Sequence, residues 1–320
     1  MEQVIIIGAG PCGLAVAIEL KKRGIDALIL EKGSLTNSIR NYPRRMRFFS
    51  TADNIEIGGL PFPTSNVKAD RTEALQYYRK AAAYFNLRFK LFTEVISYKK
   101  EGQEFIVKTS HATYKSRHLI IATGYFQQAR KLNIEGEILP HVSSYYDEPY
   151  KYSFSKVAII GGANSAIEAA LELYRHNVEV HMIVRKPEFK PTAKYWLVPD
   201  IKNRIKEGKI KVHFNTVVEK IEPNKVMVKN TKSNTGSSIP ADFVFSLIGY
   251  LPETAPLTNA GVEVNPETLV PKFDKNTFET NVPKLYLCGT IIAGKKTESV
   301  FIENGRDHAV QIAQEITGLK

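Results

Sequence analysis

The sequence has few cysteines and no long apolar run. Only Cys12 and Cys288 occur among its 320 residues, and no Cys-x-x-Cys pair is present. These two residues cannot build a disulfide framework or a cysteine-based metal cluster. The longest apolar runs have the length of a strand, so no membrane-spanning helix is predicted. The N-terminal apolar run leads into glycines with no basic segment before it, which predicts a first strand and a cytoplasmic protein.

Acidic residues are the minority charge, with 33 Asp and Glu against 44 Lys and Arg. The excess positive charge is scattered, without a basic tail or helix stripe, so we expect no nucleic-acid partner. A positive potential would also suit phosphate-rich cofactors and an anionic substrate. With 43% hydrophobic and 24% charged residues, the chain is typical of a globular protein long enough for two domains.

Two glycine fingerprints are present, one starting at Gly8 and the other at Gly161. In the first, an apolar run leads into Gly8, Gly10 and Gly13, with Pro11 and Cys12 between them. Such a turn brings the N-terminus of a helix to a pyrophosphate, whose negative charge the unpaired N–H groups can bind. Glu31 ends the predicted second strand, where a carboxylate can accept hydrogen bonds from a ribose diol.

The second fingerprint departs from the first in a way that predicts a different nucleotide. It reads Gly161-Gly162-Ala163-Asn164-Ser165, and the position corresponding to Glu31 holds Arg185, followed by Lys186. Two cations there would pair with a 2′-phosphate, so the second site is predicted to bind NADPH. The alternative is that both are solvated charges at a strand end. A chain with one NADPH site most economically holds FAD at the other.

The pattern along the chain predicts an α/β fold. Each fingerprint lies in a strand–turn–helix–strand unit, and residues 91–117 and 210–229 alternate like antiparallel strands. Residues 70–86 and 302–317 have the periodicity of helices, and the long connection over 33–66 is typical of a functional segment. We therefore expect two Rossmann-like dinucleotide-binding domains, for FAD and NADPH, with small antiparallel insertions.

Further motifs resemble those of the thioredoxin-reductase-like flavoproteins, which have two dinucleotide-binding domains. Ala122-Thr123-Gly124 is similar to the strand end that returns beside FAD in that group, and Gly249-Tyr250 opens a segment similar to its domain crossover. Gly289-Thr290 is similar to its second FAD segment, although Thr290 stands where the group usually has Asp. The resemblance implies an FAD domain over 1–124 and 251–320, a NADPH domain over 125–250, and a homo-oligomer.

Within that group the chain resembles the YpdA-type bacillithiol-disulfide reductases. The resemblance depends on Cys12 inside the first fingerprint and on motifs such as Phe48-Phe49-Ser50-Thr51 and Phe301-Ile302-Glu303-Asn304-Gly305-Arg306. Besides the fingerprint, strand-end and crossover residues already named, the cofactor-binding residues that we expect are Lys32, Asn37, Ser38, Ile39, Phe49, Ser50 and Val95. No metal site is expected.

Cys12 is the candidate catalytic residue. A cysteine in the first turn of a helix is at the positive end of the dipole, which favours the thiolate. The hypothesis is that Cys12 opens a small-molecule disulfide, with electrons passing from NADPH through FAD, so that no second cysteine is required. The alternative is that Cys12 is a small residue filling a tight turn. Cys288, at the end of a buried strand, is expected to be a core residue.

The predicted function is therefore an NADPH-dependent flavoprotein that reduces a low-molecular-weight disulfide, and bacillithiol disulfide fits best. Three alternatives stay open at this point. A flavin-dependent monooxygenase shares both nucleotide sites, although its usual Phe-x-Gly-x-x-x-His signature is absent. A ferredoxin- or flavodoxin-type NADPH reductase would use the positive charge to dock an acidic protein. A redox sensor would bind the nucleotides without turnover.

Overall fold

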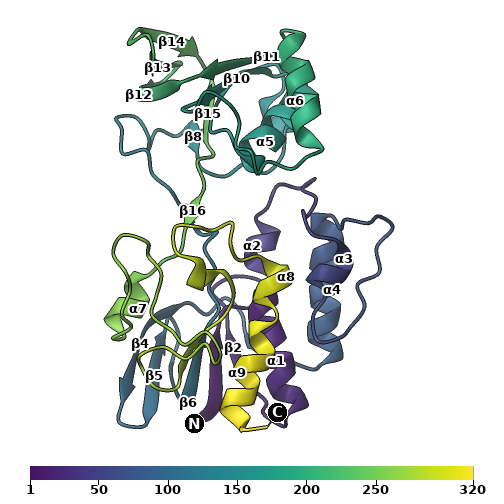
Figure 1. Ribbon diagram of the computed structural model, residues 1–320, viewed down its shortest axis with the longest axis vertical. Coiled ribbons are helices and arrows are strands. Elements are labelled where there is room, and N and C mark those ends of the chain that lie inside the picture. Colours follow the sequence, from purple (N-terminus) through teal and green to yellow (C-terminus); the bar gives the residue numbers. More distant parts are fainter. Residues whose placement is uncertain (320) are drawn as a thin grey trace. The chain divides into compact units, whose positions relative to one another are not determined.

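The computed structural model describes residues 1–319 and divides them into two compact units (Figure 1). The first unit comprises Met1–Tyr42, Arg47–Gln128 and the chain from Tyr250 onward. The second comprises Ala129–Gly249 together with the short segment Pro43–Met46. In that segment the N–H of Arg44 donates to the carbonyl of Asp147 at 2.9 Å, which explains why four residues leave the first unit.

The first unit is built on a mixed seven-stranded sheet. Its strand order is β3-β2-β1-β6-β5-β4, and β17 also pairs with β6. The pairs β1–β2, β2–β3, β1–β6 and β6–β17 are parallel, whereas β4 and β5 form an antiparallel extension beside β6. The strands are β1 (Glu2–Ile7), β2 (Leu28–Leu30), β3 (Arg88–Lys90), β4 (Val95–Glu101), β5 (Glu104–Thr109), β6 (Thr113–Ile121) and β17 (Leu285–Leu287).

Two helices from opposite ends of the chain pack against each other in this unit. They are α1 (Pro11–Lys22) and α9 (His308–Thr317), which lie side by side in Figure 1. Buried aliphatic side chains on α1, such as Leu14 and Ile18, supply its packing face. The other helices of the first unit are α2 (Asn37–Arg40), α3 (Ala52–Ile55), α4 (Arg71–Tyr84), α7 (Ala255–Asn259), α8 (Ile302–Gly305) and a 3₁₀ helix (Gly289–Ala293).

The second unit repeats this plan with a smaller sheet. Five parallel strands have the order β11-β10-β9-β15-β8, and a separate three-stranded antiparallel sheet has the order β12-β13-β14. The strands are β8 (Val142–Ser143), β9 (Lys156–Ile160), β10 (Glu179–Val184), β11 (Ile210–Phe214), β12 (Thr216–Glu222), β13 (Lys225–Asn230), β14 (Gly236–Pro240) and β15 (Phe243–Ser246). The helices are α5 (Asn164–Tyr174), α6 (Leu197–Lys206) and a 3₁₀ turn (Tyr150–Tyr152).

Where the chain passes between the units, β7 (Gln128–Ala129) and β16 (Tyr250–Leu251) form a two-stranded ribbon. The predicted α/β fold with two Rossmann-like units and antiparallel insertions is thus present. The closing helix differs from expectation, because it is broken into α8 and α9 at Arg306 and Asp307. The long connection over 33–66 also contains two single-turn helices, α2 and α3.

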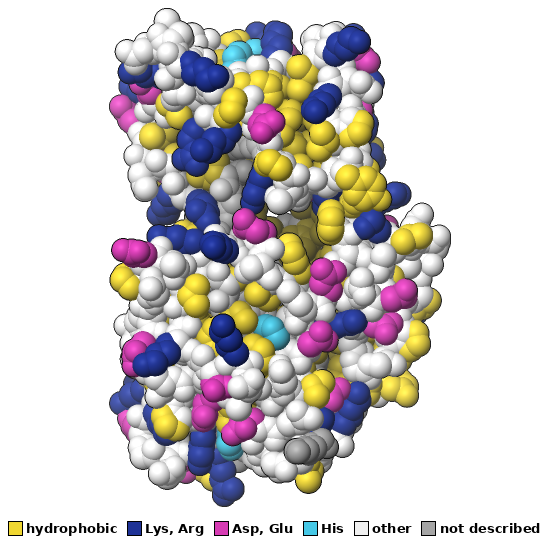
Figure 2. All heavy atoms as spheres, in the orientation of Figure 1, with side chains coloured by type: hydrophobic (Ala, Val, Ile, Leu, Met, Phe, Trp, Pro, Cys, Tyr) yellow, Lys and Arg dark blue, Asp and Glu magenta, His cyan; other side chains and the backbone are white. Residues whose placement is uncertain are grey.

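The surface and the helix lengths agree with the composition. None of the helices within residues 1–319 is long and apolar enough to span a bilayer. On the face shown in Figure 2, Lys and Arg side chains are spread over the surface and mixed with Asp and Glu. This distribution matches the scattered positive charge of the sequence.

The N-terminus of helix α4 has a capping box whose contribution to stability can be measured. Asp70 and Glu73 form a capping box, in which the Asp70 carboxylate accepts from the Glu73 N–H at 2.8 Å and the Glu73 carboxylate accepts from the Asp70 N–H at 2.9 Å. We expect Asp70→Ala to lower the free energy of unfolding by about 1 kcal/mol, because the cap is lost. Urea unfolding of the purified protein measures the change.

The matched control is Asp307→Ala, because Asp307 is the N-cap residue of α9 but makes no side-chain capping hydrogen bond. Its effect on the free energy of unfolding should be within about 0.5 kcal/mol. Equal losses in the two variants would show that the capping box does not stabilise α4.

Candidate functional site

The first fingerprint is a turn in which backbone approaches backbone. Gly8 follows β1 with a φ of +110°, and a Cβ built on it would lie 2.5 Å from the carbonyl oxygen of Ala122. A Cβ on Gly13 would lie 2.1 Å from the carbonyl oxygen of Gly8. Both positions therefore require glycine, as the spacing predicted. This close packing fixes the start of α1 directly beyond the end of β1.

Gly10, in contrast, faces open space. No atom lies within 4 Å of a Cβ built on this residue, and its φ of −76° suits any amino acid. Gly10 is also the N-cap of α1, which has no side-chain cap and begins with Pro11. Unpaired N–H groups at this end, with free space beside them, are the features that a pyrophosphate requires.

Glu31 is positioned beside the same turn. The residue is only 6% exposed, and its carboxylate accepts hydrogen bonds from the N–H of Ala9 at 2.9 Å and of Gly33 at 2.8 Å. A carboxylate has about four acceptor positions, so two remain for ribose hydroxyl groups. Sequence reasoning assigned Glu31 to a ribose and did not reveal that its carboxylate ties the turn to the end of β2.

The other strand ends meet this turn from the C-terminal part of the chain. The N–H of Cys288 donates to the carbonyl of Ile121 at 2.9 Å, which aligns β17 with β6. As a result Gly124 and Thr290 are neighbours, with a Cβ on Gly124 placed 3.4 Å from the Thr290 hydroxyl. The structure therefore brings Ala122-Thr123-Gly124 and Gly289-Thr290 together at one edge of the sheet.

The remaining predicted residues of this unit have different surroundings. Asn37 is in α2 and packs on the backbone of Gly33, while Ile39 is a buried core residue. Val95 begins β4 and packs against the hydrophobic core of the sheet. The exposed Phe49 ring has the Lys68 ammonium 5.0 Å from its centre. Lys32 is exposed, and Ser38 and Ser50 are part-buried.

An aromatic cluster near Cys12 was not predicted. The Phe126 ring lies 4.7 Å from that of Tyr42 and 4.6 Å from that of Tyr250, and Tyr125 lies 6.4 Å from Tyr250. Burial raises the pKa of Tyr42, and the neighbouring Tyr125, Tyr250 and Cys12 add to the effect. The sequence contained one signal for this cluster, the Tyr125-Phe126 pair directly after Gly124. Its contacts with Tyr42 and Tyr250 arise only in the folded chain.

Cys12 is the second residue of α1 and is part-buried. Its sulfur faces the C-terminal part of the chain, since Cβ atoms built on Gly289 and Gly305 would lie 2.8 and 2.9 Å from Sγ. Cys288, expected to be a core residue, is indeed buried, but it is in direct contact with Cys12. No local pattern in the sequence indicated this contact.

His308 supports the same edge from α9. Its Nδ1 accepts a hydrogen bond from the Gly289 N–H at 3.2 Å, and its ring stacks on Phe278 with 4.1 Å between ring centres. Burial lowers the pKa of His308 to about 4, so the imidazole is neutral at physiological pH. A neutral ring at this position orients the turn at Gly289 without adding charge.

The second fingerprint repeats the geometry of the first within the second unit. Gly161 follows β9 with a φ of +142°, and a Cβ on it would lie 2.5 Å from the carbonyl oxygen of Leu247. Ala163 is the N-cap of α5, which again lacks a side-chain cap. The Asn164 side chain accepts from the N–H of Lys194 at 2.7 Å and so holds the loop after β10, while Ser165 is exposed.

Cations gather on that loop. Arg185 and Lys186 directly follow β10 and are exposed. The N–H of Lys190 donates to the carbonyl of Gly162 at 2.9 Å, which places Lys190 beside the fingerprint. Lys190 was missed by the sequence reasoning, although the short spacing from Lys186 was a usable signal. Gly249, the last residue of this unit, accepts from the Arg130 N–H at 2.9 Å.

Lys194 makes a second, buried link on the same loop. Its ammonium lies 2.5 Å from the Glu168 carboxylate on α5, and its side chain is only 7% exposed. Burial raises the pKa of Glu168, and the charge of Lys194 partly offsets this. The ion pair therefore fixes the loop that carries Arg185 and Lys186 relative to α5.

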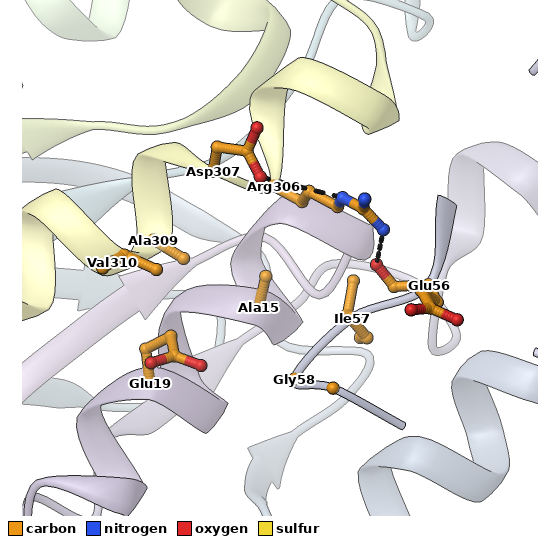
Figure 3. Close-up of a pocket in the computed structure, with 10 residues that line it drawn as sticks. Ala15, Glu19, Glu56, Ile57, Gly58, Arg306, Asp307, Ala309 and Val310 are labelled. Carbon is orange, nitrogen blue, oxygen red and sulfur yellow. Dashed lines mark hydrogen bonds and ion pairs between the residues drawn. The ribbon is translucent and has the colours of Figure 1, made fainter. Parts of the chain in front are cut away.

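An open cleft of the first unit lies away from these residues. It has a volume of about 230 Å³ and lies between α1, the turn at 56–59 and the start of α9. In Figure 3 the Arg306 side chain reaches across it to the backbone of Glu56. None of the predicted site residues lines this cleft, so its size does not locate the nucleotide sites.

Comparison with known proteins identifies the family. Bacilliredoxin reductase Bdr from Bacillus subtilis (strain 168) is 42% identical over 316 residues, which cover 98% of this chain and 97% of that protein. The structure of bacillithiol disulfide reductase Bdr (YpdA) from Staphylococcus aureus matches with a TM-score of 0.96 and 39% identity, covering 100% and 99% of the two chains. These relatives confirm the resemblance stated from the motifs.

More distant proteins share the fold. Thioredoxin reductase from T. acidophilum has a TM-score of 0.80 at 22% identity and covers 99% of this chain and 97% of its own. The family model described as pyridine nucleotide-disulphide oxidoreductase matches residues 5–289, which include both fingerprints, Cys12 and Cys288. The chain therefore belongs to the pyridine nucleotide-disulphide oxidoreductase family, and it is an enzyme of that class.

Proposed function

We propose that this protein is an NADPH-dependent FAD flavoprotein that reduces the disulfide of a low-molecular-weight thiol, bacillithiol disulfide. Membership of the family implies a flavin and a nicotinamide cofactor. The observation that carries the proposal is Cys12 placed inside the first fingerprint, in a chain whose close relatives are named for bacillithiol disulfide and bacilliredoxin reduction. The first unit would hold FAD and the second NADPH.

Residues of the first unit suit FAD. The open space beside Gly10 and the uncapped start of α1 would take the pyrophosphate, and Glu31 would accept the ribose hydroxyls. The part-buried aromatic cluster of Tyr42, Phe126 and Tyr250 offers ring surface in the same unit. When bound, a flavin accepts a hydride and returns two electrons.

Residues of the chain would also open the disulfide. Cys12 is in the first turn of α1 and is part-exposed, and its thiolate would be the species that attacks a disulfide sulfur. The attack forms a mixed disulfide on Cys12 and releases one thiol. Bacillithiol carries carboxylates, and the net charge of +11 favours an anionic substrate.

A second candidate acceptor is a disulfide on a small redox protein. The observation that favours it is the name of the Bacillus subtilis relative, which refers to a bacilliredoxin. Thiol–disulfide exchange at Cys12 would be the same for either acceptor, so the two acceptors differ only in the size of the molecule that must reach that sulfur.

The cytoplasmic location and the homo-oligomeric state stay predictions. Light scattering of the purified protein measures the oligomeric state.

A panel of electron acceptors tests the proposed function. We expect the purified, flavin-loaded protein to oxidise NADPH fastest with bacillithiol disulfide or an oxidised bacilliredoxin. Glutathione disulfide, oxygen and a ferredoxin should be poorer acceptors, and oxygen and ferredoxin also test the monooxygenase and ferredoxin-reductase alternatives. NADPH consumption is followed by absorbance. The proposal is wrong if oxygen or ferredoxin supports the fastest turnover, or if no acceptor supports any.

The cations after β10 should determine the choice of nicotinamide cofactor. Replacing both Arg185 and Lys186 by Ala should raise the KM for NADPH roughly 10- to 100-fold, because a charge-assisted hydrogen bond contributes about 1.5–3 kcal/mol. The KM for NADH should stay the same, since NADH has no 2′-phosphate. Lys232→Ala, an exposed lysine on the β13–β14 turn, is the matched control. An equal rise for both nucleotides would mean that these cations do not recognise the 2′-phosphate.

Cys12→Ala separates the disulfide chemistry from the nucleotide chemistry. Disulfide-dependent NADPH oxidation should fall by roughly two orders of magnitude or more, because the nucleophile is removed. Reduction of ferricyanide, which requires no thiol, should be retained, and absorbance should show bound flavin. If disulfide-dependent turnover persisted in this variant, Cys12 would be a turn-filling residue.

A further inference from the structure

The two cysteines of the chain, far apart in sequence, lie against each other in the first unit. The Cys288 thiol is directed at the carbonyl oxygens of Cys12, at 3.7 Å, and of Gly305, at 3.8 Å. The same Gly305 approaches the other cysteine too, because a Cβ built on it would lie 2.9 Å from Cys12 Sγ. Cys288 directly follows β17 and Cys12 is in the first turn of α1, so regular structure holds both backbones.

The surrounding backbone leaves room for sulfur at this place. Gly289 and Gly305 approach Cys12 so closely that any side chain on either would lie within 2.9 Å of its Sγ. Ordinary Cβ contacts are longer than this, so the sulfur occupies space that two missing side chains provide. The break between α8 and α9 follows directly after Gly305.

The two thiols differ in a way that suits two different roles. Cys12 is part-exposed, whereas Cys288 is 1% exposed. Burial raises the pKa of the Cys288 thiol well above its usual value, and the neighbouring Cys12 adds to the rise. Cys288 therefore remains protonated beside Cys12 and cannot itself meet a bulky disulfide. An accessible thiolate can attack a substrate, while a buried neighbour can react only with what forms on the first sulfur.

We propose that Cys288 is the resolving thiol for Cys12, so that the pair cycles between a dithiol and an intramolecular disulfide. This inference rests on the proposed function, which supplies a low-molecular-weight disulfide as the oxidant. The Cys12 thiolate attacks one sulfur of that disulfide, forms a mixed disulfide and releases the first small thiolate. The Cys288 sulfur then attacks Cys12 Sγ, its proton passes to the departing sulfur, and the second small thiol leaves.

The products are a Cys12–Cys288 bond and two small thiols. The two cysteines lose two electrons and the substrate gains them, so the exchange is balanced. Under the proposed function a hydride equivalent from NADPH, which carries two electrons and one proton, and one proton from solvent restore the dithiol. Cys288 is thus a second catalytic residue, and the chain has a cysteine pair although it has no Cys-x-x-Cys motif.

Trapping the species on Cys12 tests this role. The flavin-loaded protein is reduced with a phosphine, freed of reductant and treated with about one equivalent of bacillithiol disulfide or glutathione disulfide. In the unmodified sequence we expect release of two thiols per chain, an intact mass about 2 Da lower and a cross-linked peptide containing Cys12 and Cys288. Cys288→Ser should release one thiol and retain roughly tenfold more of the small thiol as an adduct on Cys12.

Serine is the informative replacement at position 288. Its hydroxyl can still donate to the carbonyls of Cys12 and Gly305, so a merely structural or hydrogen-bonding role would leave the adduct level unchanged. Cys12→Ser should react with neither disulfide, because Cys288 is buried. Circular dichroism and flavin absorbance confirm that both variants are folded and loaded.

Two results would overturn the inference. One is a stable mixed disulfide on Cys12 in the unmodified sequence at the level of Cys288→Ser, and the other is a failure of both cysteines to react. Failure of the proposed function is distinct, because it would appear as a lack of disulfide-dependent NADPH oxidation even where the Cys12–Cys288 bond forms. Conversely, rapid turnover without that bond would retain the function and remove Cys288 from it.

Discussion

The close approach of backbone at the first fingerprint is the constraint on which the rest of the first unit depends. Gly13 meets the carbonyl of Gly8, and Gly8 meets the carbonyl of Ala122, at distances that leave no room for a side chain. These contacts fix β1, β6 and α1 relative to one another. They also direct Gly10 toward open space and Cys12 toward β17 and α8, so a single steric requirement positions both candidate functions.

The second unit satisfies the same constraint with different partners. Gly161 meets the carbonyl of Leu247, and α5 starts without a side-chain cap, as α1 does. The copies diverge at the end of the second strand. In the first unit the Glu31 carboxylate accepts from the backbone N–H groups of the fingerprint turn and of Gly33. In the second unit an ion pair between Lys194 and Glu168 fixes a loop whose Arg185 and Lys186 side chains are exposed. The same backbone geometry is thus followed by a carboxylate in the first unit and by cations in the second.

Much of this could be predicted because the relevant signals are local. Glycine spacing, the strand-end acid and the alternation of strands each depend on residues close in sequence, and the fold class followed from them. The contact between Cys12 and Cys288 could not be predicted, because it requires β17 to pair with β6 across a long insertion. The aromatic cluster around Phe126 was missed for a similar reason, because its rings come from segments far apart in the sequence.

The segment Pro43–Met46 has a consequence for how this architecture can be divided. Because it packs with the second unit, the covalent chain crosses from one unit to the other four times. An exchange of the second unit between relatives that moved only residues 129–249 would leave behind Arg45, whose guanidinium lies 3.7 Å from the Glu172 carboxylate. The second unit is therefore discontinuous in sequence. A chimera that exchanges the whole unit must also exchange Pro43–Met46, and this requires four junctions in the chain.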